Sequence, residues 1–446
     1  MSSFEPAGLE GDLMGSVNRI QPVGYEASTP VAVRSTDSFV LWRAYMLIML
    51  AASFDVYDWL DRSVQGGATR YLIMTVPIVA AVWIRLRQPG FLVRRPMPSD
   101  IVLFALFVFG LGGSLIGVAF FGTVENARPI FLPMMIPFLY LLTTEDPTDR
   151  EVATTLSWLS IIATAYTAMN ALVNLGVLPG LAEFRQYRNA SVAVVALAVA
   201  TAIVLGKRRR LLFVLALSAV TFVTYPSATS VLVGGSVVLT FYLTGRRSSG
   251  LRTLLVSATI VMVSALALVN FDRGVQLTDQ YFAAVDKANA NSGRLDLWTE
   301  GLDRWRDAPI FGSGFAGEVT AVRSRDQRAL PFHNDFVLFL ASGGLVGLGL
   351  LVAWFVLTEL TLIRRYRGFV RAGDLRRAGL LRTILVCINA FVVAMAFNPV
   401  LPGASRSATI FGLYAIAMSL GEPPSVPRRE PTGEPQTVSA PAVPSA

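Results

Sequence analysis

Apolar stretches long enough to cross a lipid bilayer recur along the chain and leave it few possible folds. Lipid offers no hydrogen-bond partner to an unpaired peptide group, so each stretch that crosses the hydrocarbon layer, about 30 Å thick, has to be a helix. Of the 446 residues, 53% are hydrophobic and only 15% are charged, which a single water-soluble core could not accommodate. The sequence therefore predicts an all-α integral membrane protein.

We predict twelve membrane-spanning helices, most of them separated by short connections. The fourth and the seventh are short, and their ends are the least well defined. The expected ranges are 39–57, 69–86, 101–122, 128–143, 153–176, 190–206, 210–225, 228–244, 252–270, 334–362, 380–397 and 404–420.

One connection and the two ends of the chain differ from the rest. The connection at 271–332 is far longer than neighbouring helices need, and such connections are more often functional or disordered. Residues 1–38 are polar without an evident cleavable signal, and residues 421–446 are rich in Pro, Ser and Thr, so we expect both tails to be disordered. The predicted organisation is nine helices at 39–270, the large loop, and three helices at 333–420.

The distribution of positive charge predicts the orientation in the membrane. Clusters of basic residues fall in alternate connections, which the positive-inside tendency assigns to the cytoplasm. Both termini are then cytoplasmic and the large loop is extracytoplasmic. This topology accounts for the net charge of +8 and leaves no basic face for a nucleic acid. The clusters run from Arg85 to Arg95, Lys207 to Arg210, Arg246 to Arg252 and Arg364 to Arg382.

His333 is the only histidine of the chain and stands where the large loop meets the next apolar segment. The ordinary pKa of an imidazole lies near neutrality, so a histidine held at a membrane surface can take up or release a proton. The alternative is a helix-capping or interfacial histidine without chemistry.

Part of the large loop has a helical pattern. Ser292 can cap a helix, and Arg294, Trp298, Leu302 and Trp305 follow at spacings of four, four and three, which places them on one side. Tryptophan favours the headgroup layer. We expect a short amphipathic helix that lies on the membrane surface and directs Arg294 inward, and the alternative is a solvated amphipathic helix.

Several arginines are predicted on the outer side. Arg128 begins the fourth predicted span, Arg185 and Arg188 precede the sixth, and Arg294 lies in the large loop. Guanidinium groups match phosphate oxygens in pairs, so arginines on the side that the charge rule depletes indicate a lipid phosphate or pyrophosphate. Each arginine alone could instead be a surface or snorkelling charge.

Ligands for a metal ion are scarce in the sequence. Asp55, Asp58 and Asp61 are as well explained by a polar cap, and Cys387 stands alone within an apolar segment. We therefore expect no metal or other cofactor. We expect arginine, rather than a metal ion, to balance the negative charge of the phosphate or pyrophosphate when it acts as a leaving group.

A set of residues in and after the large loop resembles the signature of a known family, the O-antigen ligase and polymerase superfamily. Its members are multispanning enzymes with a large outer loop. The residues that carry the resemblance are Ser292-Gly293-Arg294, Trp298, Pro309, Gly312-Ser313-Gly314, His333-Asn334, Gly344 and Gly347.

The resemblance implies a membrane glycosyltransferase of the GT-C type in the bacterial cytoplasmic (inner) membrane. Its donor would be a glycan on undecaprenyl pyrophosphate, and its acceptor a hydroxyl at the outer face, in the biosynthesis of cell-surface polysaccharide or exopolysaccharide. It also implies inversion at the anomeric carbon and no metal. A ligase uses a lipid-anchored sugar as acceptor and a polymerase uses another lipid-linked glycan, and the sequence leaves both open.

The resemblance also implies roles for individual residues. His333 and Arg294 would be catalytic, with His333 as base on the acceptor hydroxyl. Arg294 and one of Arg185 or Arg188 would hold the pyrophosphate, and Arg128 matches a less uniform basic position. Supporting roles fall to Asn334, Trp298, Gly344 and Gly347.

One segment departs from the family pattern, and one rival function is left open. Many relatives carry a basic residue after a serine near the outer start of the eighth span, whereas this chain has Ser227-Ala228-Thr229-Ser230, which puts the identity of the donor in doubt. The rival is a transporter or flippase for the same lipid-linked polysaccharide. Such a protein should carry charges deep in its spans and repeated halves, and the predicted spans show neither.

Overall fold

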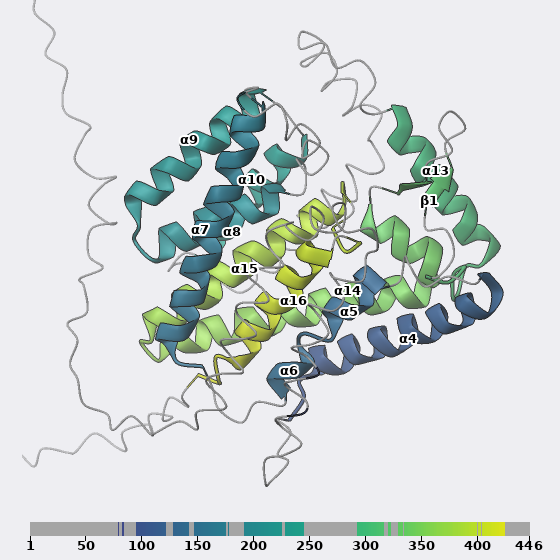
Figure 1. Cartoon of the computed structure of the whole chain (residues 1–446). Coiled ribbons are helices and arrows are strands. Elements are labelled where there is room, and N and C mark those ends of the chain that lie inside the picture. The colour runs from purple at the N-terminus through teal and green to yellow at the C-terminus, as the bar shows by residue number, and fades with distance from the viewer. Residues whose placement is uncertain are drawn as a thin grey trace, which may run out of the picture.

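Figure 1 shows the chain as a computed structural model. Several predictions lie outside the described residues: the N-terminal tail, the helices at 39–57 and 252–270, most of the helix at 69–86 and of the C-terminal tail, and Arg185, Arg188 and His333. The structure describes residues 79, 83, 95–121, 128–141, 147–174, 177, 191–224, 228–244, 292–315, 320–322, 329–332, 334–398, 400–402 and 404–423.

Apart from one short hairpin, the secondary structure of the described residues is helical, which confirms the predicted all-α class. The hairpin lies in the predicted large loop and pairs strands β1 (Thr320–Val322) and β2 (Ala329–Pro331) in antiparallel fashion. The helices are α4 (Pro98–Phe121), α5 (Arg128–Met134), α6 (Phe138–Leu141), α7 (Asp149–Asn174), α8 (Ser191–Val204), α9 (Arg208–Thr224), α10 (Ala228–Leu243), α13 (Ser292–Asp307), α14 (Asp335–Arg371), α15 (Leu375–Met395) and α16 (Ala404–Ser419).

Most predicted spans within the described residues coincide with a single helix, because a long apolar run leaves the backbone no other way to pair its polar groups. These helices are α4, α7 to α10, and α14 to α16. Three of the described helices are long and apolar enough to cross a membrane: α4 over Pro98–Leu115, α14 and α15. Shorter apolar stretches lie in α8, α10 and α16.

The fourth predicted span, 128–143, is wrong as a single helix, because the chain forms α5 and α6 with a turn between them. Pro133 and Pro137 lack the amide hydrogen that a continuing helix needs, and a proline ring clashes with the carbonyl four residues before it. A backbone hydrogen bond of 3.0 Å from Ile136 N to Pro133 O closes the turn instead. The prolines therefore divide an apolar run that composition alone reads as continuous.

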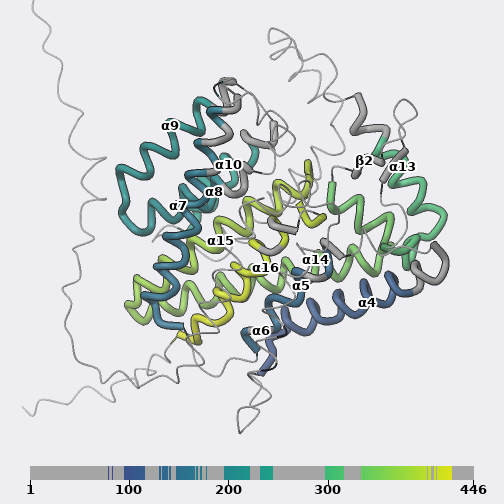
Figure 2. Tube along the Cα trace, in the orientation of Figure 1, coloured from purple at the N-terminus to yellow at the C-terminus, as the bar shows by residue number. Residues whose placement is uncertain are grey.

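Helices α14 and α15 form the centre of the described bundle and are joined by a tight turn at Gly373, whose φ is 78°. Helices α4 and α13 pack against α14, whereas α8 and α10 pack against α15, and α7 and α9 pack against α8. Helix α16 contacts α5, α6 and α15. Figures 1 and 2 show α7 to α10 on one side of the central helices and α4 and α13 on the other.

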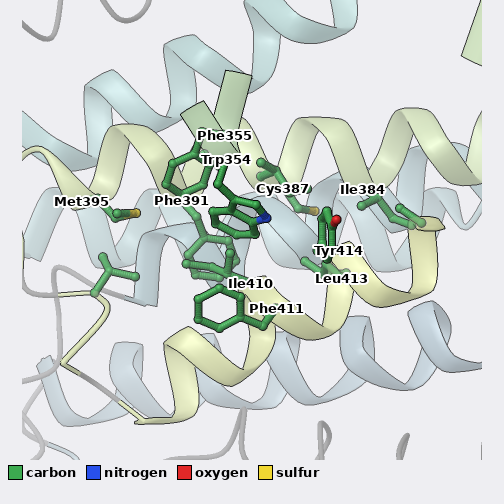
Figure 3. Close-up of a cluster of buried hydrophobic side chains, with 14 of the residues drawn as sticks. Trp354, Phe355, Ile384, Cys387, Phe391, Met395, Ile410, Phe411, Leu413 and Tyr414 are labelled. Carbon is green, nitrogen blue, oxygen red and sulfur yellow. The ribbon is translucent and has the colours of Figure 1, made fainter. Parts of the chain in front are cut away.

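The core between α14, α15 and α16 is rich in aromatic rings (Figure 3). The centroid of the Trp354 ring lies 4.6 Å from that of Phe355, 5.1 Å from that of Phe411 and 5.5 Å from that of Tyr414. Cys387 of α15 is buried in the same core. Such offset and edge-on ring contacts stabilise helix packing by more than the burial of apolar area alone. Helices α14, α15 and α16 are therefore held firmly against one another.

One end of the bundle, where α14 carries Arg365, is tied together by buried polar groups. Arg365 is only 5% exposed, and its Nη1 donates to Ala417 O at 3.1 Å and to Met418 O at 3.0 Å. These carbonyls belong to the last turn of α16, where carbonyl groups have no hydrogen-bond partner within the helix. Arg365 therefore caps α16, and we call this part of the molecule the Arg365 end. The charge distribution predicts that it faces the cytoplasm.

A buried carboxylate completes the Arg365 end. Asp100, in the first turn of α4, is 2% exposed and accepts hydrogen bonds from Met97 N at 2.7 Å, from Tyr414 Oη at 2.5 Å and from Tyr140 Oη. Asp100 itself belongs to α4, two of its donors come from α16 and α6, and Arg365 of α14 bonds to α16, so four helices are joined at this end.

Candidate active site

The opposite end of α14 carries the residues that the sequence analysis placed in the site. Asn334 caps this helix: its backbone is extended (φ −155°, ψ 114°), and its Oδ1 accepts hydrogen bonds from Phe336 N at 2.9 Å and Val337 N at 3.1 Å. A side chain in this position satisfies amides that have no partner within the helix. The chain is therefore fixed directly after His333, which itself lies outside the described residues.

The chain is also fixed directly before His333. The indole Nε1 of Trp298, in α13, donates a hydrogen bond of 2.8 Å to the carbonyl oxygen of Phe332, and both side chains are buried. The guanidinium of Arg304, also in α13, lies 5.7 Å from the centroid of the Phe332 ring. The loop helix α13 thus holds the residue that precedes the predicted base.

Removing this indole hydrogen bond gives a first prediction. We expect Trp298→Phe to lower the free energy of unfolding by about 1–2 kcal/mol, because the buried Phe332 carbonyl would lose its donor. Thermal unfolding of the purified protein in detergent would measure the change. Trp305→Phe is the matched control, because its Nε1 bond of 3.1 Å to Pro309 O is exposed and water can replace it. Equal losses in the two variants would contradict the role of Trp298.

Helix α13 and the first part of α14 run side by side in the same direction. A Cβ atom added to Gly301 would lie 2.5 Å from Val337 Cγ1, so the two helices meet closely there, and Pro309 and Ile310, just after α13, bond to residues further along α14. Arg294 lies one turn before Trp298, about 6 Å along the helix axis, on the side that carries Trp298 and Gly301. The backbone of Arg294 therefore lies one helical turn away from the residue that bonds to Phe332.

The face that α13 buries differs from the predicted one. The prediction grouped Trp298 with Leu302 and Trp305, but Leu302 is 38% exposed, whereas Leu297 and Trp298 are buried. The missing side chain of Gly301 allows the close approach and turns this side of α13 toward α14. The helix itself was predicted correctly, but its apolar side packs on protein.

Gly344 breaks the helical hydrogen-bonding of α14. Its backbone (φ 60°, ψ −161°) is far from helical, so the groups on both sides of it lose their partners within the helix. The segment that follows α13, residues 309–314, supplies new ones, and we call it the docked segment. Its amides donate to α14, from Ser313 N to Ala341 O at 3.0 Å and from Gly314 N to Ser342 O at 2.8 Å.

Amides of α14 also donate hydrogen bonds to the docked segment. Leu345 N donates to Pro309 O at 2.9 Å, and Val346 N donates to Ile310 O at 3.1 Å. Irregular backbone within a membrane bundle is tolerated where protein satisfies its polar groups, as the docked segment does here.

The glycines at and near this break serve different structural purposes. A Cβ at Gly344 would overlap Ile310 O, and a Cβ at Gly312, where φ is 71°, would overlap the backbone of Ser342. Both positions need a left-handed backbone and close approach. Gly347 is helical, and its added Cβ would lie 3.1 Å from Phe109 of α4, so it serves helix packing.

The predicted arginines are only partly brought together by the described residues. Arg128 begins α5, three residues before Phe131, whose ring centroid lies 4.9 Å from that of Phe315, the residue after the docked segment. The start of α5 is therefore near the α13 and α14 assembly. Arg185 and Arg188 lie outside the described residues.

Asp335, the first residue of α14, is a buried polar residue beside the predicted site that the sequence analysis did not single out. It is 1% exposed, and its Oδ2 accepts hydrogen bonds from Val400 N at 3.0 Å and Leu401 N at 2.8 Å. In sequence it resembles an ordinary acidic residue at a helix start, which the helix dipole favours. Its hydrogen-bond partners lie in the turn between α15 and α16, and no local sequence pattern predicts them.

The fold and these contacts define a multispanning helical membrane protein in which a loop helix is bonded to the start of a broken membrane helix. Residues 215–352, less than half of the chain, match the family model described as O-antigen ligase, and this match supports the resemblance to the O-antigen ligase and polymerase superfamily. The family implies a glycan-transferring enzyme that acts on lipid-linked glycans. A search among curated proteins found no match.

The matched region covers the loop helix and the start of the broken helix. It contains α10, α13, the hairpin, the docked segment and the break in α14, together with Arg294 and His333. Arg128, Arg185 and Arg188 precede it.

Proposed function

We propose that the protein transfers or polymerises a glycan from an undecaprenyl-pyrophosphate donor onto an acceptor hydroxyl at the outer face of the cytoplasmic membrane. Both termini are cytoplasmic in this proposal, and the large loop with α13 lies outside. The reaction inverts the anomeric carbon and uses no metal, and its product is a cell-surface polysaccharide.

The observation that carries the proposal is the fixed position of the chain on both sides of His333. Trp298 bonds to Phe332 before it, and Asn334 caps α14 after it. A general base has to be held within hydrogen-bond reach of the proton that it removes, so a base needs such a fixed backbone. Arg294 belongs to the helix that provides this fixation.

The proposed residues perform complementary parts of one displacement. The acceptor oxygen attacks the anomeric carbon from the face opposite the pyrophosphate, and the bond between that carbon and the pyrophosphate oxygen breaks as the new bond forms. His333 takes the proton of the acceptor hydroxyl. Arg294, one of Arg185 or Arg188, and Arg128 stabilise the charge that develops on the pyrophosphate.

A transporter or flippase for the same lipid-linked glycan is the alternative. Alternating access requires each end of the bundle to open in turn. At the Arg365 end, opening would separate Arg365 and Asp100 from partners on α16 and leave buried charges without compensation. The buried contacts at the Arg365 end therefore favour an enzyme that binds its substrate at the opposite end of the bundle.

One experiment separates these possibilities. Purified protein in liposomes would be given a lipid-linked repeat with a labelled sugar, with and without a lipid-anchored sugar acceptor. We expect a new glycosidic product. Chain growth without the second acceptor identifies a polymerase, and product only in its presence identifies a ligase. Donor that crosses the bilayer chemically unchanged, with no product in any arm, would overturn the proposal in favour of a transporter.

The phosphate role of Arg294 gives a second prediction. We expect Arg294→Lys to lower kcat/KM for the donor by about tenfold or more, because an ammonium cannot reproduce the two-pronged hydrogen bonding of a guanidinium. Initial rates over a range of donor concentrations would measure it. Arg306→Lys, on an exposed position of the same helix, is the matched control and should be neutral. Donor kinetics unchanged by Arg294→Lys would remove this residue from the pyrophosphate site.

A further inference from the structure

The turn between α8 and α9 presents three consecutive basic side chains. Lys207, Arg208 and Arg209 are all exposed, and the first turn of α9 contains no acidic residue. The backbone that carries them is fixed, because Lys207 N donates to Ala202 O at 2.9 Å and Leu211 N donates to Lys207 O at 3.0 Å. The three charges are therefore held together at one place on the surface.

The start of α15 brings a further cation to the end of α8. A Cβ atom added to Gly379 would lie 3.1 Å from Val204 Cγ1, so α15 meets the last residue of α8 there. Arg376 precedes Gly379 by three residues, which places it on the same side of α15, and its side chain is exposed. The name basic cluster is used below for Lys207, Arg208, Arg209 and Arg376.

Two acidic residues near the basic cluster are engaged by another arginine. Asp149, at the start of α7, accepts a hydrogen bond of 2.8 Å from Arg377 Nε, and a carboxylate oxygen of Asp374 lies 3.6 Å from the same atom. Among the residues that the structure describes, Lys207 and Arg209 have no ion-pair partner. The basic cluster therefore carries positive charge that these carboxylates do not neutralise.

Exposed apolar side chains continue from the basic cluster along α9. This helix packs against α7 and α8 and lies at the outside of the bundle (Figure 1). Leu212 and Phe213 follow Arg208 and Arg209 by one turn, so each pair shares a side of the helix. Leu212 is 67% exposed and Phe213 is 54% exposed. Cations with apolar side chains one turn further match the headgroup and the acyl chains of a phospholipid.

We propose that the basic cluster and the exposed side of α9 bind an anionic phospholipid at this surface of the membrane. The headgroup phosphate accepts hydrogen bonds from the lysine and arginine side chains, and the acyl chains lie along Leu212 and Phe213. Helix α15 begins where α14 ends, so the site lies toward the Arg365 end, which the charge distribution predicts to be cytoplasmic. Lipid binding there is independent of the proposed glycan transfer, which takes place at the opposite end.

Native mass spectrometry of the purified protein with added lipid would test this site. We expect the unaltered protein to bind phosphatidylglycerol more tightly than phosphatidylcholine of the same acyl chains, whose headgroup has no net charge. The double variant Lys207→Gln with Arg209→Gln should bind phosphatidylglycerol about tenfold more weakly or worse, because each lost cation reduces the attraction to an anionic headgroup. Equal affinity of the unaltered protein for the two lipids would overturn the proposal, whether or not the variant accumulates.

Two control variants separate the basic cluster from net charge and from folding. Arg306→Gln with Arg364→Gln removes the same charge from exposed positions on α13 and α14 and should leave the affinity for phosphatidylglycerol unchanged. Lys207→Arg with Arg209→Lys keeps both charges and should bind the lipid as the unaltered protein does. If the two double glutamine variants lost affinity equally, the lipid site would not lie at the basic cluster.

Discussion

Replacing His333 by alanine is expected to lower glycan transfer by about 10²- to 10⁴-fold, the usual contribution of a positioned general base. The acceptor hydroxyl would have to lose its proton to water while its oxygen attacks the anomeric carbon. Alanine leaves the cap at Asn334 in place, so α14 should still begin at Asp335. Transfer from a labelled lipid-linked repeat in membranes, normalised to the amount of protein, would measure the loss.

Two comparisons make this prediction specific to the base. His333→Gln keeps a polar side chain of similar size that cannot accept the proton, so it should be about as inactive as His333→Ala. Both variants should unfold at the temperature of the unaltered protein. Transfer at the original rate in either variant, at normal protein levels, would show that His333 is not the base.

The second large effect is expected from Gly344→Ala, which should cost about 3 kcal/mol or more of folding stability. The backbone of Gly344 lies in a region that other residues rarely enter, and the new methyl group would overlap Ile310 O in the docked segment. The docked segment would then have to leave the break and abandon its hydrogen bonds to α14. Thermal unfolding in detergent and protein abundance in membranes would measure the change.

Gly349→Ala is the matched control in the same helix. A Cβ at Gly349 would have no neighbour within 4 Å, and alanine is the better helix former by about 1 kcal/mol. We therefore expect this variant to be as stable as the unaltered protein or slightly more stable. If the two alanine variants lost stability equally, the docking at Gly344 would not be the reason for its glycine.

Much of the described fold could be predicted from apolar runs alone. Helices such as α7 and α10 begin and end within a few residues of their expected bounds, because lipid leaves a long apolar run no alternative to a helix. The prediction at 128–143 was wrong because hydropathy does not register the missing amide hydrogens of Pro133 and Pro137. The buried face of α13 was wrong because Gly301, not the tryptophan spacing, determines which side can approach α14.

The candidate site was only partly accessible to sequence reasoning. Trp298 and Asn334 were named as supporting residues, and their hydrogen bonds now give them definite positions beside His333. Asp335 was missed because its partners Val400 and Leu401 are distant in sequence, so no local spacing relates them.

Arginines counted only as an orientation signal turned out to have structural partners. Arg365 caps α16, and Arg382 donates to Thr244 Oγ1 at 2.7 Å and to the carbonyl of Phe241 near the end of α10. A charge cluster shows where basic residues gather, but it cannot show which helix ends they cap.

The hydrogen bonds between the docked segment and the break in α14 limit where insertions and deletions can occur. The stretch from Trp298 to Gly312 is attached at both ends to the stretch from Phe332 to Gly344. An insertion or deletion in one stretch alone would shift the register between them and break one of the two attachments. The two stretches can therefore grow or shrink only as a matched pair.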